Sequence, residues 1–260
     1  MSDSHIVVER GPVATVKLNR PDARNAMSDQ TLKQVAAALR SLSSDAALRA
    51  VVVRGEGKDF CAGADIEWMR RAGQLPLEEG KVDAWLLADM LRCVEACPVP
   101  VIVAAHGNIF GGGLGLVAAC DIAVLADDAK LCFSECRLGI MPAVVSCWVL
   151  PKIGAANARR YYLTAESFSA AQAVQMGLAS EAVPPAELAA RVDVVVGNVL
   201  KNGPQAVRTA KALIPQLEGK SLEEQVDLSV ETLVRLRSSP EGQEGLTAFL
   251  ERRAAAWQKQ

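Results

Sequence analysis

The chain has 260 residues, half of them hydrophobic and 22% charged, so it can bury one large core, or one core with a small appended domain. Its formal net charge of -2 gives no electrostatic reason to expect nucleic acid or an anionic membrane surface as the main partner. We expect a cytoplasmic protein, because no apolar run reaches about 18 residues, no signal-peptide pattern opens the chain, and the seven cysteines form no CxxC pair.

Strand and helix signals alternate over the first half of the chain. β-branched residues predict two short strands, and apolar residues at helical spacing from Leu32 to Leu42 predict a helix with Ser28 as its N-cap. The expected strands are 5–11, 13–19, 48–57, 99–107, 121–127 and 130–135, with a second helix over roughly 82–97. The strand over 48–57 is apolar throughout, as in a strand covered on both faces. This repeated alternation predicts an α/β fold with layered sheets.

Strand signals vanish past about residue 150. A short helix is expected from a cap at Ser169 to Gly177. Amphipathic helices follow over 184–204, 205–219 and 221–239, and a tail helix over 241–257. We therefore expect a core domain over residues 1–195 and a C-terminal helical region over 196–260, which packs on the core or on a neighbouring subunit.

The stretch GNIFGGGLGLVAACDIAV, residues 107–124, combines a glycine triplet with a long apolar run. Three adjacent glycines favour close approach of another group to the backbone, because glycine has no side chain. A helix is expected to begin at the triplet, and the first N–H groups of a helix lack partners within it and attract negative charge. The triplet is therefore a candidate anion-binding site.

Two other segments carry candidate chemistry. FCAGAD, residues 60–65, has small residues that leave backbone N–H groups accessible. Glu135 ends the apolar segment KLCFSE, where a carboxylate is costly to bury without a task or a partner. Two N–H groups that converge on one carbonyl oxygen would form an oxyanion hole, worth roughly 3 to 4 kcal/mol per donor in the transition state. Each segment alone also has an ordinary explanation, namely turn geometry, packing or a solvated carboxylate.

In their order and spacing, these segments resemble the crotonase, or enoyl-CoA hydratase/isomerase, superfamily from about residue 5 to the C-terminus. The matching segments are LNRPDARNAMS, FCAGADIEWM, GNIFGGGLGLVAACDIAVLADDAKLCFSE, RLGIMP and EGLTAFLERRAAAW. The resemblance implies a spiral of β-β-α turns with a C-terminal helical extension for trimerisation, in a homotrimer or a dimer of trimers. It also implies acyl-CoA substrates, with no metal and no cofactor beyond the coenzyme A of the substrate.

The resemblance implies roles for particular residues. The backbone N–H groups of Ala64 and Gly112 would hold the thioester oxygen and stabilise an enolate, and Glu135 would be the acid/base. The residues implied in binding the acyl-CoA are Arg24, Ala26, Ala62, Asp65, Ile66, Gly111, Pro142 and Ala143, with Phe249 and Arg252 from a neighbouring tail helix.

Gly115 departs from the family pattern. Typical hydratases carry one glutamate at the position of Gly115 and a second, twenty residues later, at the position of Glu135. The two carboxylates divide the proton transfers of hydration between them. Here Glu135 either performs both transfers, or the reaction needs only one acid/base.

Two subfamilies tolerate a single glutamate: Δ3-Δ2-enoyl-CoA isomerases, and bacterial methylglutaconyl-type hydratases that act on 3-branched glutaconyl-CoA. The segments GADIEWM, FGGGLGL and SECRLGIMPAVVS resemble the second group more closely. We therefore predict a hydratase of methylglutaconyl-CoA or isohexenylglutaconyl-CoA, in leucine or acyclic terpene breakdown. The alternatives are an isomerase, a dehydratase of the 3-hydroxy-3-methylglutaryl skeleton, and a non-catalytic acyl-CoA-binding protein, against which Glu135 argues.

Other polar residues carry weaker signals. His106 is expected to be a core or hydrogen-bonded histidine, not a catalytic one. Ser146 and Cys147 could line the acyl pocket, but the chain lacks a nucleophile elbow of the G-x-S-x-G kind beside them. Arg137 shares strand parity with Glu135, so it could face the same pocket and meet a substrate carboxylate. The cysteines are not expected to bind metal.

Overall fold

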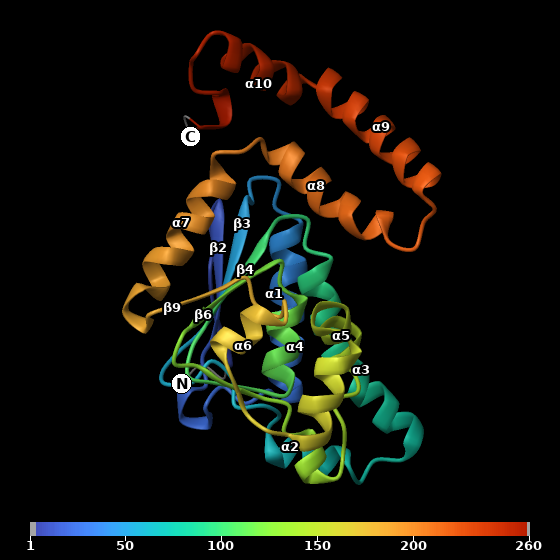
Figure 1. Ribbon diagram of the computed structural model, residues 1–260. Coiled ribbons are helices and arrows are strands. Elements are labelled where there is room, and N and C mark those ends of the chain that lie inside the picture. Colours follow the sequence, from blue (N-terminus) through green and yellow to red (C-terminus); the bar gives the residue numbers. More distant parts are fainter. Residues whose placement is uncertain (1–3, 259–260) are drawn as a thin grey trace.

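A six-stranded sheet forms the centre of the chain, of which the computed structural model describes residues 4–258 (Figure 1). Its strands, in spatial order, are β1 (Ile6–Glu9), β2 (Val13–Leu18), β3 (Ala50–Gly55), β4 (Val101–Ala105), β6 (Ile122–Ala126) and β9 (Glu181–Val183). β1 is antiparallel to β2, and the other neighbouring pairs are parallel. A smaller sheet holds β5 (Asn108–Phe110), β7 (Lys130–Cys132) and β8 (Phe168–Ser169).

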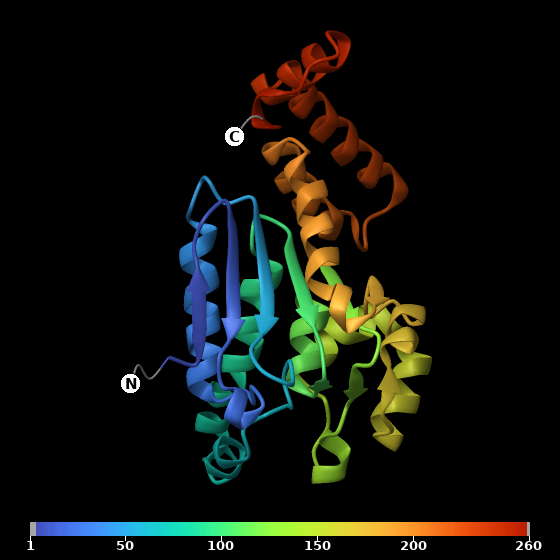
Figure 2. The ribbon, with the colours of Figure 1, turned by 90° about the vertical axis from the view of Figure 1, so that its left-hand side faces the viewer.

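Helices cover both faces of the large sheet (Figure 2). They are α1 (Asp29–Ser43), α2 (Ile66–Ala72), α3 (Leu77–Glu95), α4 (Gly112–Ala119), α5 (Ser146–Thr164), α6 (Ala170–Gln175), α7 (Leu188–Leu200), α8 (Pro204–Leu217), α9 (Leu222–Ser238) and α10 (Pro240–Leu250). Short 3-10 helices are η1 (Pro21–Ala23), η2 (Glu135–Leu138), η3 (Pro185–Glu187) and η4 (Ala256–Gln258). The predicted α/β fold is confirmed.

The sheet separates two hydrophobic cores, because side chains alternate between the faces of a strand. Val51 and Val53 of β3 belong to the larger core, which includes α1, α3 and α4. Ala50 and Val52 belong to a smaller core beneath α7. The strand predicted over 48–57 is thus covered on both faces, as its apolar run indicated.

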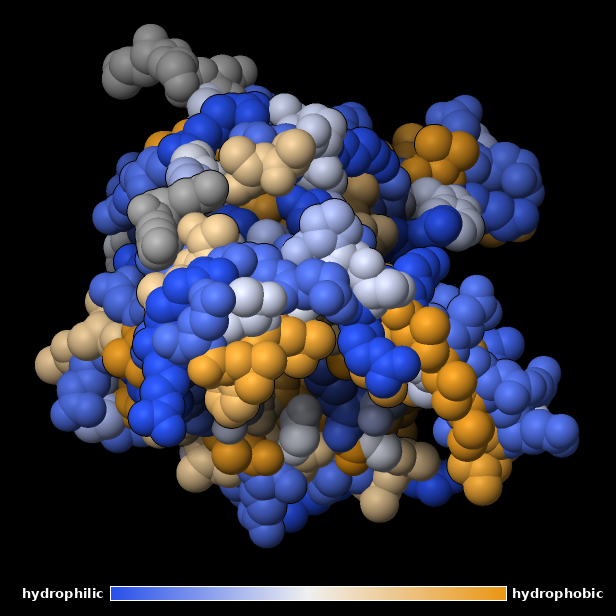
Figure 3. Space-filling view, turned by 90° about the horizontal axis from the view of Figure 1, so that it is seen from above, coloured by the Kyte–Doolittle hydropathy of each residue, from blue (hydrophilic) through white to orange (hydrophobic). Residues whose placement is uncertain are grey.

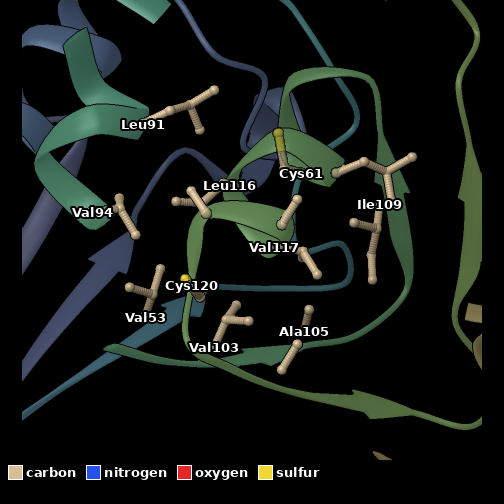
Figure 4. Close-up of a cluster of buried hydrophobic side chains, with 14 of the residues drawn as sticks. Val53, Cys61, Leu91, Val94, Val103, Ala105, Ile109, Leu116, Val117 and Cys120 are labelled. Carbon is tan, nitrogen blue, oxygen red and sulfur yellow. The ribbon is translucent and has the colours of Figure 1, made fainter. Parts of the chain in front are cut away.

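Helix α4 lies inside the larger core. It is apolar on all sides, which is typical of a buried helix rather than a surface one. Figure 4 shows Leu116 and Val117 of α4 among Leu91 of α3, Val103 of β4 and Ile109 of β5. This packing on every side fixes the direction of the helix, and with it the position of the glycine-rich turn at its N-terminus.

Two predicted helix starts are confirmed by their caps. The Ser28 side chain accepts a hydrogen bond from the Thr31 N–H at the start of α1. Ser169 forms a capping box with Gln172 at the start of α6. Both caps satisfy N–H groups that a helix leaves without internal partners.

Other sequence expectations are wrong. Strands β8 and β9 lie past residue 150, and they are too short, at two and three residues, to give a period-2 signal. The strand expected over 130–135 ends at Cys132, so Glu135 begins the 3-10 helix η2 instead. Helix α5 was not predicted, because Pro151 and the non-helical Gly154 interrupt its pattern.

The last three helices form an arm that extends from the sheet and its covering helices (Figures 1 and 2). The residue 195/196 boundary expected from the sequence lies inside α7, which packs on the sheet, so the arm begins with α8. Hydrophobic side chains are exposed at this end of the molecule (Figure 3). Those on the arm are Ile214, Leu222, Val226, Val230, Leu233, Val234, Leu246, Phe249 and Leu250.

A cavity of about 1350 Å³ lies between the arm and the core. Lys152 and Asp121 on the core side and Lys211 and Thr232 on the arm side contribute to its walls, which do not include Glu135. Lys211 bridges the two parts, since its Nζ is 2.6 Å from Asp121 Oδ2. Within residues 4–258, no helix combines the length and the apolar character needed to cross a bilayer.

Candidate active site

Glu135 presents a buried carboxylate oxygen with nothing to bind. Its side-chain Oε2 is inaccessible to solvent and has no hydrogen-bond partner among the described residues. Its other oxygen, Oε1, lies 3.1 Å from the point where a Cβ on Gly111 would stand. Burial raises the pKa of the Glu135 carboxyl above its usual value, because the charged form loses hydration there. A carboxyl in this state is suited to exchange protons with a bound molecule.

Two backbone N–H groups, of Gly112 next to Gly111 and of Ala64 on the 60–65 loop, are also free. Gly112 is the first residue of α4, so its N–H has no acceptor within the helix. Within residues 4–258, neither this group nor the Ala64 N–H donates to a protein acceptor. Ala64 directly precedes Asp65, the N-cap of α2. Gly112 therefore donates from the start of α4, where partial positive charge gathers, and Ala64 donates from the loop before α2.

Backbone hydrogen bonds bring these donors together from distant parts of the chain. The Cys61 N–H donates to the Asn108 carbonyl, and the Phe110 N–H donates back to the Cys61 carbonyl. This pairing joins the loop 60–65 to the strand that leads into α4. A Cβ on Gly113 would stand only 2.9 Å from Cys61 Cβ, so this glycine permits the close contact.

Met27 connects both sides of the site. Its N–H donates to the Gly63 carbonyl, and its own carbonyl accepts from the Asp65 N–H, so its backbone flanks Ala64 on the 60–65 loop. Its Sδ lies 3.1 Å from the position of a Cβ on Gly112. A Cβ at residue 112 would therefore require this sulfur to shift by a few tenths of an ångström.

Gly111 has a different reason to be glycine. Its φ of +48° lies in the left-handed region, and a Cβ there would press against Glu135 Oε1 at 3.1 Å. The chain turns here from β5 into α4, and the Gly111 N–H donates to the Cys132 carbonyl. The turn sets the carboxylate of Glu135 against the free end of α4.

The space above Gly115 is already filled. A Cβ on Gly115 would stand 2.5 Å from Val145 Cγ1 and 3.4 Å from Leu91 Cδ1. Real Cβ contacts at 2.5 Å do not occur, so a glutamate at residue 115 would require Val145 to move. The position is closed by packing, and the wall of the site on this side is apolar.

Four of the residues predicted to bind coenzyme A cluster around the Ala64 loop. The Ala62 N–H donates to the Arg24 carbonyl, and the Ala26 carbonyl accepts from the Arg20 guanidinium. Asp65 pairs with Arg20 at 3.0 Å. Burial alone would raise the pKa of Asp65, but the Trp68 N–H and Arg20 outweigh it and lower that pKa.

The remaining predicted contacts are less uniform. Ile66 is 81% exposed beside this loop, and Pro142 is buried while Ala143 is exposed, both between Glu135 and α5. Phe249, 81% exposed on α10, and Arg252 just after it lie on the arm, at the opposite end of the chain's fold from α2 (Figure 1). Within one chain, the structure does not bring the arm residues to Glu135. Their role as residues of a neighbouring copy stays a prediction.

The hydrogen bonds and burial of His106, Arg137 and the cysteines show what these weaker candidates contact. His106 Nε2 is 2.8 Å from the Gly57 carbonyl oxygen, in line with the expected hydrogen-bonded role. The strand parity expected for Arg137 and Glu135 is wrong, because both residues lie on η2 and the Arg137 guanidinium donates to the Ala165 carbonyl. All seven cysteines have free thiols. Burial raises the pKa of the Cys61 thiol to about 12, which keeps it unreactive.

Sequence reasoning missed several residues of the site. Met27, Val145 and Leu91 are ordinary apolar residues, and only their contacts with glycines reveal them. Tyr162 was also missed, and only the structure shows that its hydroxyl lies 3.2 Å from Ser146 Oγ. No local pattern marks any of these four residues. Among the described residues, no three His, Cys, Asp or Glu side chains gather in a way that could hold a metal ion.

The arrangement can stabilise a carbonyl oxygen that gains negative charge and can move a proton nearby. The free N–H groups of Gly112 and Ala64 are suited to the first task, and the unpartnered carboxylate is suited to the second.

Comparisons with known proteins point to the same chemistry. The chain matches the family described as "Enoyl-CoA hydratase/isomerase" over residues 9–260. A crotonyl-CoA hydratase of Syntrophomonas wolfei is 31% identical over 258 residues, which cover 98% of each protein. A solved enoyl-CoA hydratase from Shewanella pealeana is 34% identical, with a TM-score of 0.93 over 98% of this chain and 96% of that one. Pseudomonas aeruginosa AtuE is 31% identical, with a TM-score of 0.94 over 98% of this chain and 100% of that one.

Proposed function

Because the chain belongs to the enoyl-CoA hydratase/isomerase family and is a lyase of the enoyl-CoA hydratase type, we propose that it adds water across the 2,3 double bond of a 3-branched glutaconyl-CoA. The observation that carries the hydration chemistry is the buried, unpartnered Oε2 of Glu135 beside the free end of α4. The branched substrate is supported by the segments GADIEWM, FGGGLGL and SECRLGIMPAVVS.

The proposed reaction uses one carboxylate for two proton transfers. Glu135 takes a proton from water while the water oxygen bonds to C3, and the double-bond electrons move onto the thioester oxygen. The N–H groups of Ala64 and Gly112 stabilise the resulting enolate. Glu135 then returns the proton to C2, which gives the 3-hydroxyacyl thioester. The raised pKa of Glu135 favours this second transfer, because the protonated acid is easier to form in the buried site.

A comparison of three substrates tests the proposal. Purified protein is assayed with crotonyl-CoA, 3-methylglutaconyl-CoA and a 3-enoyl-CoA, by the absorbance of the conjugated enoyl thioester. We expect the absorbance to fall fastest with 3-methylglutaconyl-CoA. Equal rates with crotonyl-CoA would remove the branched substrate from the proposal but leave hydration in place.

Replacement of the acid/base is the matched test of the chemistry. We expect Glu135→Gln to lower kcat by about 10²-fold to 10⁴-fold, the usual range for a positioned acid/base. Glu166→Gln is the control, because Glu166 pairs with Arg160 away from the site. Full activity in Glu135→Gln would remove the catalytic assignment.

The filled space above Gly115 favours a second candidate, a Δ3-Δ2-enoyl-CoA isomerase. Isomerisation moves one proton between carbons and needs no bound water, so a single carboxylate beside an apolar wall of Val145 and Leu91 would suffice. The same assay separates the two functions. Isomerisation of the 3-enoyl-CoA makes the conjugated absorbance rise, whereas hydration of a 2-enoyl-CoA makes it fall.

A further inference from the structure

Tyr162 on α5 carries a hydroxyl that the reaction above does not use. Its ring meets the Phe133 ring in a T-shaped arrangement, with ring centroids 4.8 Å apart. Phe133 stands two residues before Glu135, so this contact ties α5 to the segment that carries the carboxylate. The Tyr162 side chain is half-buried, and its hydroxyl lies 3.2 Å from Ser146 Oγ.

The Ser146 hydroxyl anchors the phenol. Its O–H is placed to donate to two acceptors, the Pro142 carbonyl and, at 3.2 Å, the Tyr162 hydroxyl oxygen. A phenol oxygen that accepts one hydrogen bond keeps a second lone pair, which can accept from another molecule.

Tyr162 is also within electrostatic reach of Glu135. Burial raises the pKa of Tyr162 most, the hydrogen bond with Ser146 lowers it, and the charge of Glu135 raises it again. The wall at Gly115 offers no polar group, because Val145 and Leu91 fill it. A water bound to Glu135 would therefore find its second acceptor on the α5 side of the site.

We propose that the Tyr162 hydroxyl, anchored by Ser146, positions the attacking water against Glu135. This inference rests on the proposed hydration. One water hydrogen goes to Glu135 as the water oxygen bonds to C3, and the other donates to the Tyr162 oxygen. Tyr162 keeps its own proton throughout, and the proton held by Glu135 passes to C2. The hydrogen bonds from the water and from Ser146 thus converge on the Tyr162 oxygen.

The test removes this hydroxyl and compares the result with its neighbour. In Tyr162→Phe, kcat for hydration is expected to fall by about 10-fold to 100-fold, the cost of losing one hydrogen bond to a reacting group, with KM changed by less than about 2-fold. Tyr161→Phe is the control, because Tyr161 is buried and packs its ring on Phe168 at 4.6 Å. Its kcat is expected to stay within about 2-fold. Thermal unfolding checks that both variants fold.

A second variant separates loss of the hydrogen bond from a change in folding. Ser146→Ala leaves the Tyr162 ring in place but removes its anchor, so kcat is expected to fall in the same direction. Unchanged kcat in Tyr162→Phe, an equal fall in Tyr161→Phe, or a change confined to KM overturns the inference. If the wild-type protein hydrates no enoyl-CoA at all, the proposed function fails instead. The two failures are therefore distinguishable.

Discussion

At the scale of single residues, the site depends on one carboxylate in an unfavourable environment. Glu135 loses hydration without gaining a partner for Oε2, which costs folding free energy whenever the group is ionised. The unfavourable carboxylate lies beside the free N–H group of Gly112. Activity and stability are therefore expected to respond to Glu135 in opposite directions.

The pH dependence of activity follows from this environment. Glu135 must be ionised to accept the proton of water, and its pKa is raised by burial. We expect the acidic limb of kcat/KM to lie at a higher pH than the ordinary glutamate value. A pH profile measured with the best substrate of the panel checks this. A limb at or below the ordinary value would contradict the buried, unpartnered state.

The pH dependence of stability follows with a fixed sign. A carboxyl whose pKa is raised in the folded protein favours folding below its unfolded pKa, and this contribution disappears as pH rises through the folded pKa. Glu135→Gln is therefore expected to be more stable than wild type at neutral pH, with the difference shrinking as the medium is acidified. Urea unfolding at neutral and acidic pH measures it, and a destabilised variant at neutral pH would show that the carboxylate has a partner.

At the scale of elements, the segment leading into α5 packs closely on α4 because Gly115 of α4 has no side chain. Val145, immediately before α5, occupies the volume that a Cβ on Gly115 would need. The glutamate that typical hydratases carry at this position is thus excluded by the neighbouring helix as well as absent from the sequence. The two residues must change together for a second carboxylate to enter.

This coupling predicts the result of a double-mutant cycle. Gly115→Ala is expected to cost about 1 to 3 kcal/mol of folding free energy through overpacking, and Val145→Ala in the same chain should recover part of it. Gly197→Ala on α7 is the control, because nothing lies within 4 Å of its added Cβ. That change is expected to stabilise the chain by about 0.4 to 1 kcal/mol. Additive effects at 115 and 145 in denaturant unfolding would refute the packing explanation.

At the scale of the whole molecule, the arm of α8, α9 and α10 is the part that packs least against the rest of the chain. Its helices bury little within the chain: Thr232 is the buried residue of α9 and Ala248 that of α10. Exposed apolar side chains along these helices favour contact with another surface. We propose that the arm packs on neighbouring copies in a trimer or a dimer of trimers.

The assembly is tested by one charge on the arm. Val230 is 55% exposed on α9, and Val230→Lys is expected to lower the mass measured by sedimentation to that of smaller species, because a lysine would be buried against the neighbour. Glu223→Lys, at an exposed position of the same helix, should leave the mass unchanged. A wild-type monomer at all concentrations would rule out the proposed assembly.

The sequence by itself determined the α/β fold, most strands of the large sheet and the caps of α1 and α6, and it singled out Glu135 as the candidate acid/base. These features depend on residues close together in the chain, where apolar periodicity and capping residues act directly. It did not reveal β8, β9 or α5, which are too short or interrupted by Pro151 and Gly154.

Only the tertiary structure decided what surrounds Glu135. The sequence marked Gly115 as a missing glutamate, but the Val145 methyl that fills its place comes from thirty residues later. In the same way, Tyr162 reaches the segment of Glu135 through its contact with Phe133. These relations depend on the side-chain volumes and hydrogen-bond partners that meet when α4 and α5 pack together, and no local pattern in the chain encodes such a meeting.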